Sequence, residues 1–339
     1  MTSLLIITGT ILIIALFALV YRILALVNIA KGTHEKRVGF SNTVNGFLFI
    51  VFFFVGFGAF FWYSGKAEYL PPPSSEHGVI TDNLFWVTTA IITVAFVLTH
   101  ILLFFFPYWF RFREDRKAHW YPDNTKLELL WTVIPGAVMA LLVITGLIEW
   151  TKITAPAPED AVQFEIVGKQ FNWMVRYPGK DGKLGKYDYT KIDGTNQLGM
   201  DFANDKANFD DFIPREIHIP KGKPVKLNIR ARDVLHSVYM PHFRVKMDAV
   251  PGMPTTFWFI PTKTTAEMRK ELNNDKFNYE MACTEVCGNG HFAMRMIIVV
   301  DEPEEFNKWV TEQEPWASQN KDYIAGLNLR DLNLADLEK

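Results

Sequence analysis

Cysteine is scarce in this chain of 339 residues, which has only Cys283 and Cys287, four positions apart. No C-x-x-C-H sequence is present, and this excludes a covalently attached c-type haem. The chain also has no phosphate-binding glycine loop and no nucleophile–base motif, so it offers no hydrolytic or phosphoryl-transfer chemistry of its own. A net charge of only −2 indicates no preference for any class of partner.

Long apolar runs, by contrast, are concentrated in the first half of the chain. A membrane-spanning helix needs about 20 apolar residues, and a bilayer offers unpaired backbone groups no other partner, so each run is predicted to be helical. A removed signal peptide is the alternative for the first run, but that run has no basic start and no clear cleavage site. The four predicted spans are residues 4–27, 46–63, 84–110 and 129–150.

Charges in the connecting loops predict the orientation of these spans. The loops at 31–37 and 111–126 are basic, whereas the loop at 66–82 is rich in proline and net acidic. The positive-inside rule assigns basic loops to the cytoplasm, so both termini and the whole second half of the chain are expected outside. Arg22, near the cytoplasmic end of the first span, can extend its head group to the membrane surface.

The second half of the chain changes to the period-two pattern of β-strands. Short β-branched or aromatic runs separated by Gly, Pro, Asn and Asp predict a β-sandwich or a Greek-key barrel. Residues 178–212 are expected to form an inserted surface loop, residues 262–276 a short amphipathic helix, and the tail beyond Trp316 an extended segment. The predicted strands are 162–167, 215–220, 224–229, 255–260, 277–282 and 296–300.

The loop CTEVCGNGHFAM, residues 283–294, gathers both thiols with the imidazole of His291 and the thioether of Met294, just before the last predicted strand. A second imidazole, His236, lies at the end of an earlier predicted strand, and loops at one pole of a sandwich converge. Disulfides are permitted in the compartment outside the membrane, so a disulfide between the two cysteines is one interpretation.

Metal binding is the other interpretation, and the ligand types separate the candidate metals. Zinc accepts two cysteines and two histidines in a closed tetrahedron and has no use for Met294. Soft thiolate and thioether ligands beside imidazole favour copper. Because a mononuclear blue-copper site uses one cysteine, two thiolates that can bridge two metals fit a dinuclear copper centre better. Such a centre suits electron transfer rather than substrate chemistry.

Five segments identify a family when they are taken in order along the chain. They are LELLWTVIP (127–135), GKQFNW (168–173), DVLHSVYMP (233–241), VKMDAVPGM (245–253) and CTEVCGNGHFAM (283–294). Together they closely resemble subunit II of haem–copper cytochrome c oxidase, over roughly residues 80–312. The resemblance implies an α-helical membrane anchor of four transmembrane helices followed by an all-β cupredoxin-like sandwich that carries a dinuclear copper A centre.

Carried over position by position, the resemblance implies six copper ligands, one of them a backbone carbonyl. They are His236, Cys283, Cys287, His291, Met294 and the carbonyl oxygen of Glu285. The carboxylate of Glu285 matches the family residue that also binds a magnesium or manganese ion at the interface with subunit I. Glu128, at the cytoplasmic start of the last span, matches the carboxylate at the mouth of a proton-uptake path. A plain helix-end charge is the alternative for Glu128.

The function that the resemblance implies is that of the electron-accepting subunit of a proton-pumping terminal oxidase. Electrons from a c-type cytochrome would pass through the copper centre to haem in subunit I, which reduces dioxygen to water. The expected location is the bacterial inner membrane, with the copper domain on the periplasmic side. Subunits I and III are the implied partners in the membrane, and no nucleic acid is expected among the partners.

Two other functions are weighed against this one. A quinol oxidase subunit that has lost copper would share the fold, but it would have no reason to keep the complete ligand set. A membrane-tethered copper- or zinc-binding or delivery protein is the second alternative. Such a carrier needs exposed, exchangeable ligands, whereas these ligands lie in a loop framed by strands and include a distant histidine.

The chain departs from the family pattern first in its length. The family commonly has two spans, and the last two spans here match them, so the first two are additional. The expected division is an extra transmembrane hairpin at 1–80, a subunit II-type hairpin at 81–152, the copper domain at 153–312 and a tail at 313–339.

Two further departures concern the donor of electrons. Phe171 stands where the family has the tryptophan at which electrons arrive, and Trp173 is either a core aromatic or a neighbour on that route. We therefore expect a donor held by an associated quinol-oxidising complex. The insertion also adds acidic residues that are expected to be solvated or, alternatively, to steer a basic cytochrome. They are Asp201, Asp205, Asp210 and Asp211.

Overall fold

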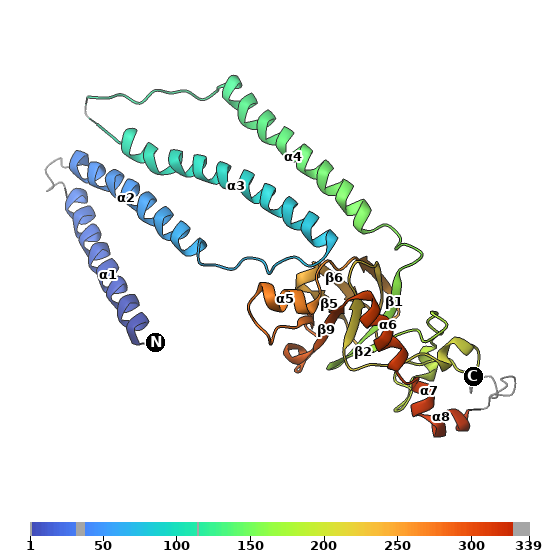
Figure 1. Cartoon of the computed structure of the whole chain (residues 1–339). Coiled ribbons are helices and arrows are strands. Elements are labelled where there is room, and N and C mark those ends of the chain that lie inside the picture. Colours follow the sequence, from blue (N-terminus) through green and yellow to red (C-terminus); the bar gives the residue numbers. More distant parts are fainter. Residues whose placement is uncertain (1, 32–37, 114, 328–339) are drawn as a thin grey trace. The chain divides into compact units, whose positions relative to one another are not determined.

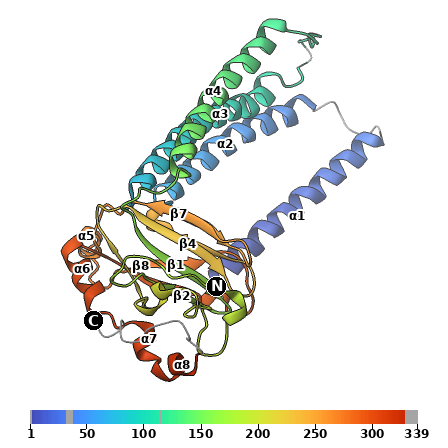
Figure 2. The same cartoon turned by 90° about the vertical axis from the view of Figure 1, so that its right-hand side faces the viewer.

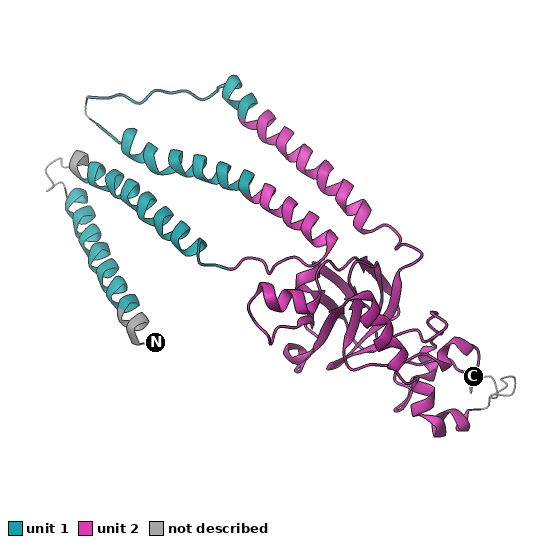
Figure 3. Ribbon diagram, viewed as in Figure 1, with its two compact units in different colours: residues 1–67, 90–130 teal, residues 68–89, 131–339 magenta. Residues whose placement is uncertain are grey.

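The computed structural model describes residues 2–31, 38–113 and 115–327, and it divides into two compact units (Figure 3). One unit comprises residues 1–67 and 90–130, and the other comprises residues 68–89 and 131–339. Residues 32–37 of the basic loop and residues 328–339 of the tail lie outside the described residues.

Four long apolar helices among the described residues make up the membrane anchor (Figure 1). Each is long and apolar enough to cross a membrane, which confirms the four predicted spans. The helices extend past the apolar runs because helical hydrogen bonding continues into the polar interface. They are α1 (Thr2–Ala30), α2 (Val38–Ser64), α3 (Glu76–Trp109) and α4 (Thr125–Ile153).

Aromatic side chains and one glycine join α2 to the second half of α3. The rings of Phe57 and Phe96 stack with their centroids 5.6 Å apart. Farther along, the helices approach so closely that a Cβ on Gly46 would lie 2.9 Å from the Cα of Tyr108. Any side chain at position 46 would therefore push the two helices apart, as is general for small residues at helix contacts in membranes.

Nine strands among the described residues form the β-domain as two sheets, which confirms the predicted sandwich. One sheet has the order β2-β1-β4-β7, whose strands are neighbours in Figure 2, and the other has the order β3-β9-β8-β5-β6. The pairs β1–β4 and β3–β9 are parallel. The strands are β1 (Val162–Lys169), β2 (Asn172–Arg176), β3 (Ile217–Pro220), β4 (Val225–Ala231), β5 (His236–Met240), β6 (Val245–Ala249), β7 (Thr255–Phe259), β8 (Tyr279–Cys283) and β9 (Arg295–Asp301).

Three strands, β2, β5 and β6, do not appear among the predicted strands. In β5 four of the five residues are buried, so the alternation that marks a half-exposed strand is absent. His236 begins this strand, and its prediction as the end of an earlier strand was wrong. The predicted amphipathic helix is α5 (Thr265–Glu271), which starts with a capping box between Thr264 and Glu267.

The insertion and the tail form a second apolar core. On the face of β1 that points away from the other sheet, Val167 packs with residues of the insertion and with Trp316 of the tail. Phe202 of the insertion stacks on Trp316 with ring centroids 5.5 Å apart. The predictions of a surface loop and an extended tail were therefore wrong. The tail forms α7 (Trp316–Gln319) and α8 (Lys321–Gly326), after α6 (Pro303–Glu312).

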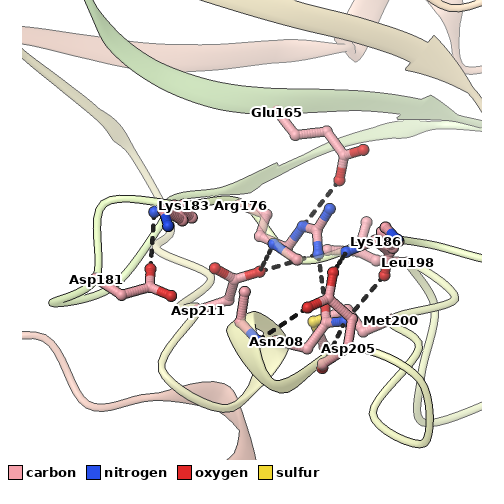
Figure 4. Close-up of polar contacts among 12 residues, drawn as sticks. Glu165, Arg176, Asp181, Lys183, Lys186, Leu198, Met200, Asp205, Asn208 and Asp211 are labelled. Atoms are coloured by element: carbon pink, nitrogen blue, oxygen red, sulfur yellow. Dashed lines mark hydrogen bonds and ion pairs between the residues drawn. The ribbon is translucent and has the colours of Figure 1, made fainter. Parts of the chain in front are cut away.

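A network of charges is buried beneath the same insertion (Figure 4). Arg176 on β2 pairs with Glu165 and with Asp211, each at 3.0 Å, and Arg230 on β4 binds the same Glu165 at 2.7 Å. All four side chains are more than nine-tenths buried. Charges this deep are tolerated because each one has a partner of opposite sign.

The four aspartates of the insertion all have partners within the chain. Asp201 pairs with a lysine, Asp205 caps a short 3-10 helix, Asp210 accepts a backbone hydrogen bond, and Asp211 belongs to the buried network. None of them is exposed. Neither the solvated loop nor the steering surface predicted for these residues is present.

The segment that leads into α3 is bound to the β-domain. Arg244 donates two hydrogen bonds to the carboxylate of Asp82, at 2.7 and 2.8 Å, and a third to the carbonyl of Pro71 at 2.6 Å. The hydroxyl of Ser75 donates to the carbonyl of Phe243 at 2.7 Å. Because Arg244 joins β5 to β6, these bonds fix the hairpin that carries His236 against the start of α3.

His218 on β3 holds together the sandwich and α6. Its ring lies 2.6 Å from Asp301 and 3.2 Å from Glu216, and it stacks on Trp309 with centroids 4.2 Å apart. Burial lowers the pKa of His218, but the two carboxylates outweigh burial and raise it above 6.5. Such a group stabilises the fold fully below its unfolded pKa, and the stabilisation is lost as the pH rises through the folded pKa.

We expect His218→Gln to lower the melting temperature of the β-domain by about 2–4 °C at pH 5.5, and by less at pH 9. The imidazolium bonds to Asp301 and Glu216 are lost in acid, whereas at pH 9 the wild-type ring is already neutral. Near-UV circular dichroism of the full chain in detergent measures the change. His119→Gln, at an exposed histidine, is the matched control. Equal losses at both pH values would assign the effect to packing on Trp309.

Candidate metal centre

His236, Cys283 and Cys287 bring their ligand atoms within 4.8 Å of one another, and all three are buried. His236 begins β5 and Cys283 ends β8, and these two strands pair antiparallel. Cys287 follows in the loop between β8 and β9. Among the described residues, this is the group of His, Cys, Asp and Glu side chains spaced to hold a metal ion. The sheet register thus brings together residues that the sequence separates by 47 positions.

The other two predicted side-chain ligands lie beside Cys287. The Nδ1 atom of His291 is 3.7 Å from the Sγ atom of Cys287, and the Sδ atom of Met294 is 3.3 Å from the same sulfur. His291 begins a short 3-10 helix that ends where β9 starts, and Met294 is fully buried. The loop therefore folds back so that its last two donors face its second cysteine.

Cys283 has its own pair of donors on the opposite side. Its Sγ atom lies 3.9 Å from the Nδ1 atom of His236 and 3.2 Å from the carbonyl oxygen of Glu285. Each thiol consequently has one imidazole beside it. The structure brings together all six groups that the resemblance implies, with the two sulfurs between the two imidazoles.

The state of the thiols is informative about what the site can bind. Both cysteines are free, so the structure contains no disulfide between them. Burial and the neighbouring Cys283 raise the pKa of Cys287 to about 11. The protein alone therefore opposes a pair of thiolates, and a bound cation would supply the missing positive charge, because coordinated thiols lose their protons. Buried sulfur and imidazole donors are suited to a soft metal such as copper.

Two residues that the sequence analysis missed hold His236 in place. Asp233 accepts a hydrogen bond from Nε2 of His236 at 2.9 Å and another from the amide of Gln170 at 2.7 Å. Burial raises the pKa of Asp233, but these bonds outweigh burial and lower it. With Nε2 engaged, Nδ1 is the nitrogen left for the thiols. Gly168 leaves room for the ring, since a Cβ there would lie 2.8 Å from it.

Phe171 and Trp173 occupy different environments. Phe171 is 41% exposed in the turn between β1 and β2, and its ring lies against the metal loop, where a Cβ on Gly290 would come within 2.5 Å of it. Trp173 is buried in the inner core, and its indole N–H donates to the carbonyl of Met294 at 3.4 Å. The geometry of Trp173 is thus that of a core aromatic that contacts the site.

The two predicted carboxylates, Glu285 and Glu128, are both exposed. Glu285 lies in the metal loop between the cysteines, where its carbonyl faces Cys283. Glu128 lies in the first turn of α4, and its amide donates to the carbonyl of Asn124 at 2.9 Å. Within this chain, each carboxylate is accessible to a partner.

Comparison with known proteins agrees with this arrangement. Residues 162–302 match the family of the cytochrome c oxidase subunit II periplasmic domain, and residues 71–147 match the transmembrane domain of the same subunit. The alternative cytochrome c oxidase subunit 2 of Bradyrhizobium diazoefficiens is 34% identical over 79% of this chain and 92% of that protein. Cytochrome c oxidase subunit 2 of Thermostichus vulcanus is 29% identical over 76% of this chain and 82% of that protein.

Among solved structures, the periplasmic domain of subunit II of cytochrome oxidase from Bradyrhizobium japonicum is 27% identical, with a TM-score of 0.32. The match covers 46% of this chain and 95% of that domain. Four membrane-spanning helices and a matched periplasmic domain assign the protein to the inner membrane, with the β-domain on the periplasmic side. The sequence matches and the fold agree on one assignment: the chain belongs to the cytochrome c oxidase subunit II family.

Proposed function

We propose that this chain accepts electrons for a terminal oxidase through a dinuclear copper centre. The proposal rests on the convergence of six donors around two buried thiols, in a member of this family. Bound there, two copper ions would share one unpaired electron and transfer it with little change in geometry. The proposed ligands are His236, Cys283, Cys287, His291, Met294 and the carbonyl oxygen of Glu285.

The protein's own contribution is to hold these donors rigidly and to exclude water. His236 and Cys283 are fixed by the pairing of β5 with β8, and Asp233 fixes the orientation of the imidazole. The amide side chain of Gln170 donates to the carbonyl of Cys287 at 2.5 Å, which fixes the loop. A donor set that does not move when its charge changes favours fast electron transfer.

A role in copper or zinc delivery is less well supported. Delivery needs ligands that a partner can reach, but the exposed fractions of His236, Cys283, Cys287 and Met294 are all 8% or less. Buried sulfur donors from two separate strands and a loop favour a resident metal over a passing one. The complete donor set also disfavours a quinol oxidase subunit without copper.

The donor that we propose is a c-type cytochrome, held by an associated quinol-oxidising complex. Phe171 is exposed beside the metal loop, so a donor can reach this part of the surface. Its phenyl ring has no N–H group to bind a partner, unlike the indole of a tryptophan. Trp173 behind it would link the surface to the carbonyl of Met294. Electrons would then pass to haem in subunit I for the reduction of dioxygen, coupled to proton pumping.

Two further roles are proposed for the exposed carboxylates. The side chain of Glu285 is available to bind a magnesium or manganese ion together with subunit I, since both metals prefer carboxylate oxygens. Glu128, at the cytoplasmic end of α4, is available as the first carboxylate of a proton-uptake path. Both roles require residues of the partner subunit to complete the site.

Metal analysis of the full chain, purified in detergent and supplied with copper, tests the central proposal. We expect two copper ions per chain and an electron paramagnetic resonance signal from one unpaired electron coupled to both nuclei. The cysteines impose this result because two thiolates can bridge two metals. A single copper with the spectrum of an isolated ion, or zinc in preference to copper, would contradict the proposal.

A further inference from the structure

A polar pocket of about 230 Å³ lies between α2 and the end of α3, in the unit that contains the additional helices. Asn42, Asn45 and Arg111 supply its polar groups, and Phe49 and Phe112 supply apolar walls. The pocket forms beside Gly46, where the two helices approach most closely. Neither the copper centre nor the family assignment explains a polar pocket at this position.

The polar groups of the pocket are arranged as donors. Arg111 donates from Nε to the hydroxyl of Thr43 at 3.1 Å and from Nη1 to the carbonyl of Tyr108 at 2.6 Å. Its guanidinium also stacks over the ring of Tyr108, with its central carbon 4.4 Å from the centroid. These contacts fix the side chain and leave Nη2 without a partner among the described residues. A fixed guanidinium with a free N–H group is suited to bind an anion.

Arg22 of α1 turns a second residue of the pocket into a donor. It donates from Nη2 to the side-chain oxygen of Asn45 at 2.7 Å. The NH₂ group of Asn45 is then the part of the amide that remains for a ligand. Arg22 thereby adds a positive charge close to the pocket and fixes the orientation of the asparagine.

The position of the pocket selects the kind of anion. With the β-domain on the periplasmic side, the start of α2 and the end of α3 lie on the cytoplasmic side of the membrane. The segment 111–117, which follows α3, has four basic and two acidic residues, and the acidic Asp115 pairs with Arg113 at 3.3 Å. The lipids of the cytoplasmic leaflet include anionic phospholipids, whose phosphates are attracted to basic residues at this depth.

An apolar groove continues from the pocket along α3. Thr99, Leu102, Leu103 and Phe106 lie three or four positions apart on one face of the helix and line a hollow of about 500 Å³. Pro107 lines both this groove and the polar pocket, so the two are adjacent. We propose that the pocket binds the phosphate of an anionic phospholipid and that the groove holds one of its acyl chains.

Native mass spectrometry of the full chain in detergent tests the proposal with two defined probes, dioleoyl-phosphatidylglycerol and dioleoyl-phosphatidylcholine. We expect one phosphatidylglycerol to bind in preference to phosphatidylcholine. Arg111→Gln should weaken this binding by about fivefold, the fold-change equivalent to the roughly 1 kcal/mol contributed by one basic residue near an anionic surface. Arg113→Gln is the matched control, because it removes the same charge from the same segment but does not line the pocket.

Several outcomes would overturn the proposal. Equal losses in the Arg111 and Arg113 variants would assign the effect to general surface charge, and equal binding of the two lipids would exclude recognition of an anion. If inorganic phosphate in excess displaces phosphatidylglycerol, the site takes a free phosphate group and the acyl groove has no role. Should Arg111→Gln fail to fold, Asn42→Leu removes a donor from the pocket without touching the helix contact, and unchanged lipid binding there would count against the site.

Discussion

Replacing Cys287 by serine is expected to abolish the proposed copper centre. The sulfur of this residue lies 3.3 Å from the thioether of Met294 and 3.7 Å from the imidazole of His291, so it is the donor that links the loop's ligands to Cys283. A serine hydroxyl does not ionise in a buried site and does not bridge two soft metals. Since loss of an outer-shell partner alone costs up to about 100-fold in metal affinity, loss of this ligand should cost more.

Copper content, measured by mass spectrometry of the purified full chain, checks this result together with the paramagnetic signal. We expect at most one copper per chain and no signal from a shared electron. Met296→Leu is the matched control, because this methionine is also buried and lies only two positions from Met294, in strand β9. A Cys287→Ser protein that retained two coppers would refute the bridging role, and unchanged near-UV circular dichroism would show that the fold is intact.

The membrane anchor and the metal loop were the parts of the molecule that the sequence predicted most fully. A bilayer forces an apolar run of sufficient length to be helical, so the spans follow from composition alone. The loop at 283–294 carries four of the ligands within twelve residues, so their proximity needs no knowledge of the fold. His236 is different, because only the pairing of β5 with β8 brings it to Cys283.

The residues that support the site were harder to predict, because their roles depend on contacts between distant segments. Asp233 is three positions before His236, and this short spacing was the available signal for its hydrogen bond to the imidazole. Gln170 gave no such signal, since it reaches the carbonyl of Cys287 across 117 positions of sequence. Gly168 and Gly290 are read as turn residues in the sequence, whereas in the structure they make room for rings.

The insertion at 178–212 misled the sequence analysis for a physical reason. Its many Asp, Lys and Gly residues are typical of a solvated loop, and its apolar residues have no period. The missing element is the exposed face of β1, which collects Leu198, Met200 and Phe202 from the insertion and Trp316 from the tail. A sheet face that needs to be covered is visible only after the sheet itself is known.

Replacing Arg176 by methionine is expected to cause the largest loss of stability in the β-domain, about 3–5 kcal/mol. Arg176 donates to Glu165 and Asp211 at 3.0 Å and to the side-chain oxygen of Asn208 at 2.8 Å (Figure 4). Without it, two buried carboxylates lose a positive partner. One oxygen of Asp211 already has no partner among the described residues, so this group cannot compensate elsewhere.

The loss is expected to grow as the pH rises. Burial raises the pKa of Asp211 to about 7 although Arg176 lowers it, so removal of the arginine should raise it further. For Glu165, burial also raises the pKa, but Arg176 and Arg230 together outweigh burial and lower it. A carboxyl group whose pKa is higher in the folded state destabilises the fold as the pH rises above its unfolded pKa. The variant should therefore be weakest above pH 8.

Denaturant unfolding of the full chain in detergent, followed by tryptophan fluorescence at pH 6 and pH 8.5, measures this effect. Arg295→Met is the matched control, because Arg295 is exposed and its pair with Glu280 is 3.4 Å long, so its loss should cost at most about 0.5 kcal/mol. Equal stabilities of the two variants would show that the buried charges contribute nothing net to the fold.

The stability of this network should also reach the metal centre. Arg176 ends β2, and the turn before β2 carries Gln170 and Phe171, which contact the metal loop. An insertion that detaches from Arg176 would loosen β2 at its edge of the sheet, since β2 pairs only with β1. We therefore expect the Arg176→Met protein to bind copper normally at low temperature and to release it at a lower temperature than the wild type, whereas Arg295→Met should release it at the wild-type temperature.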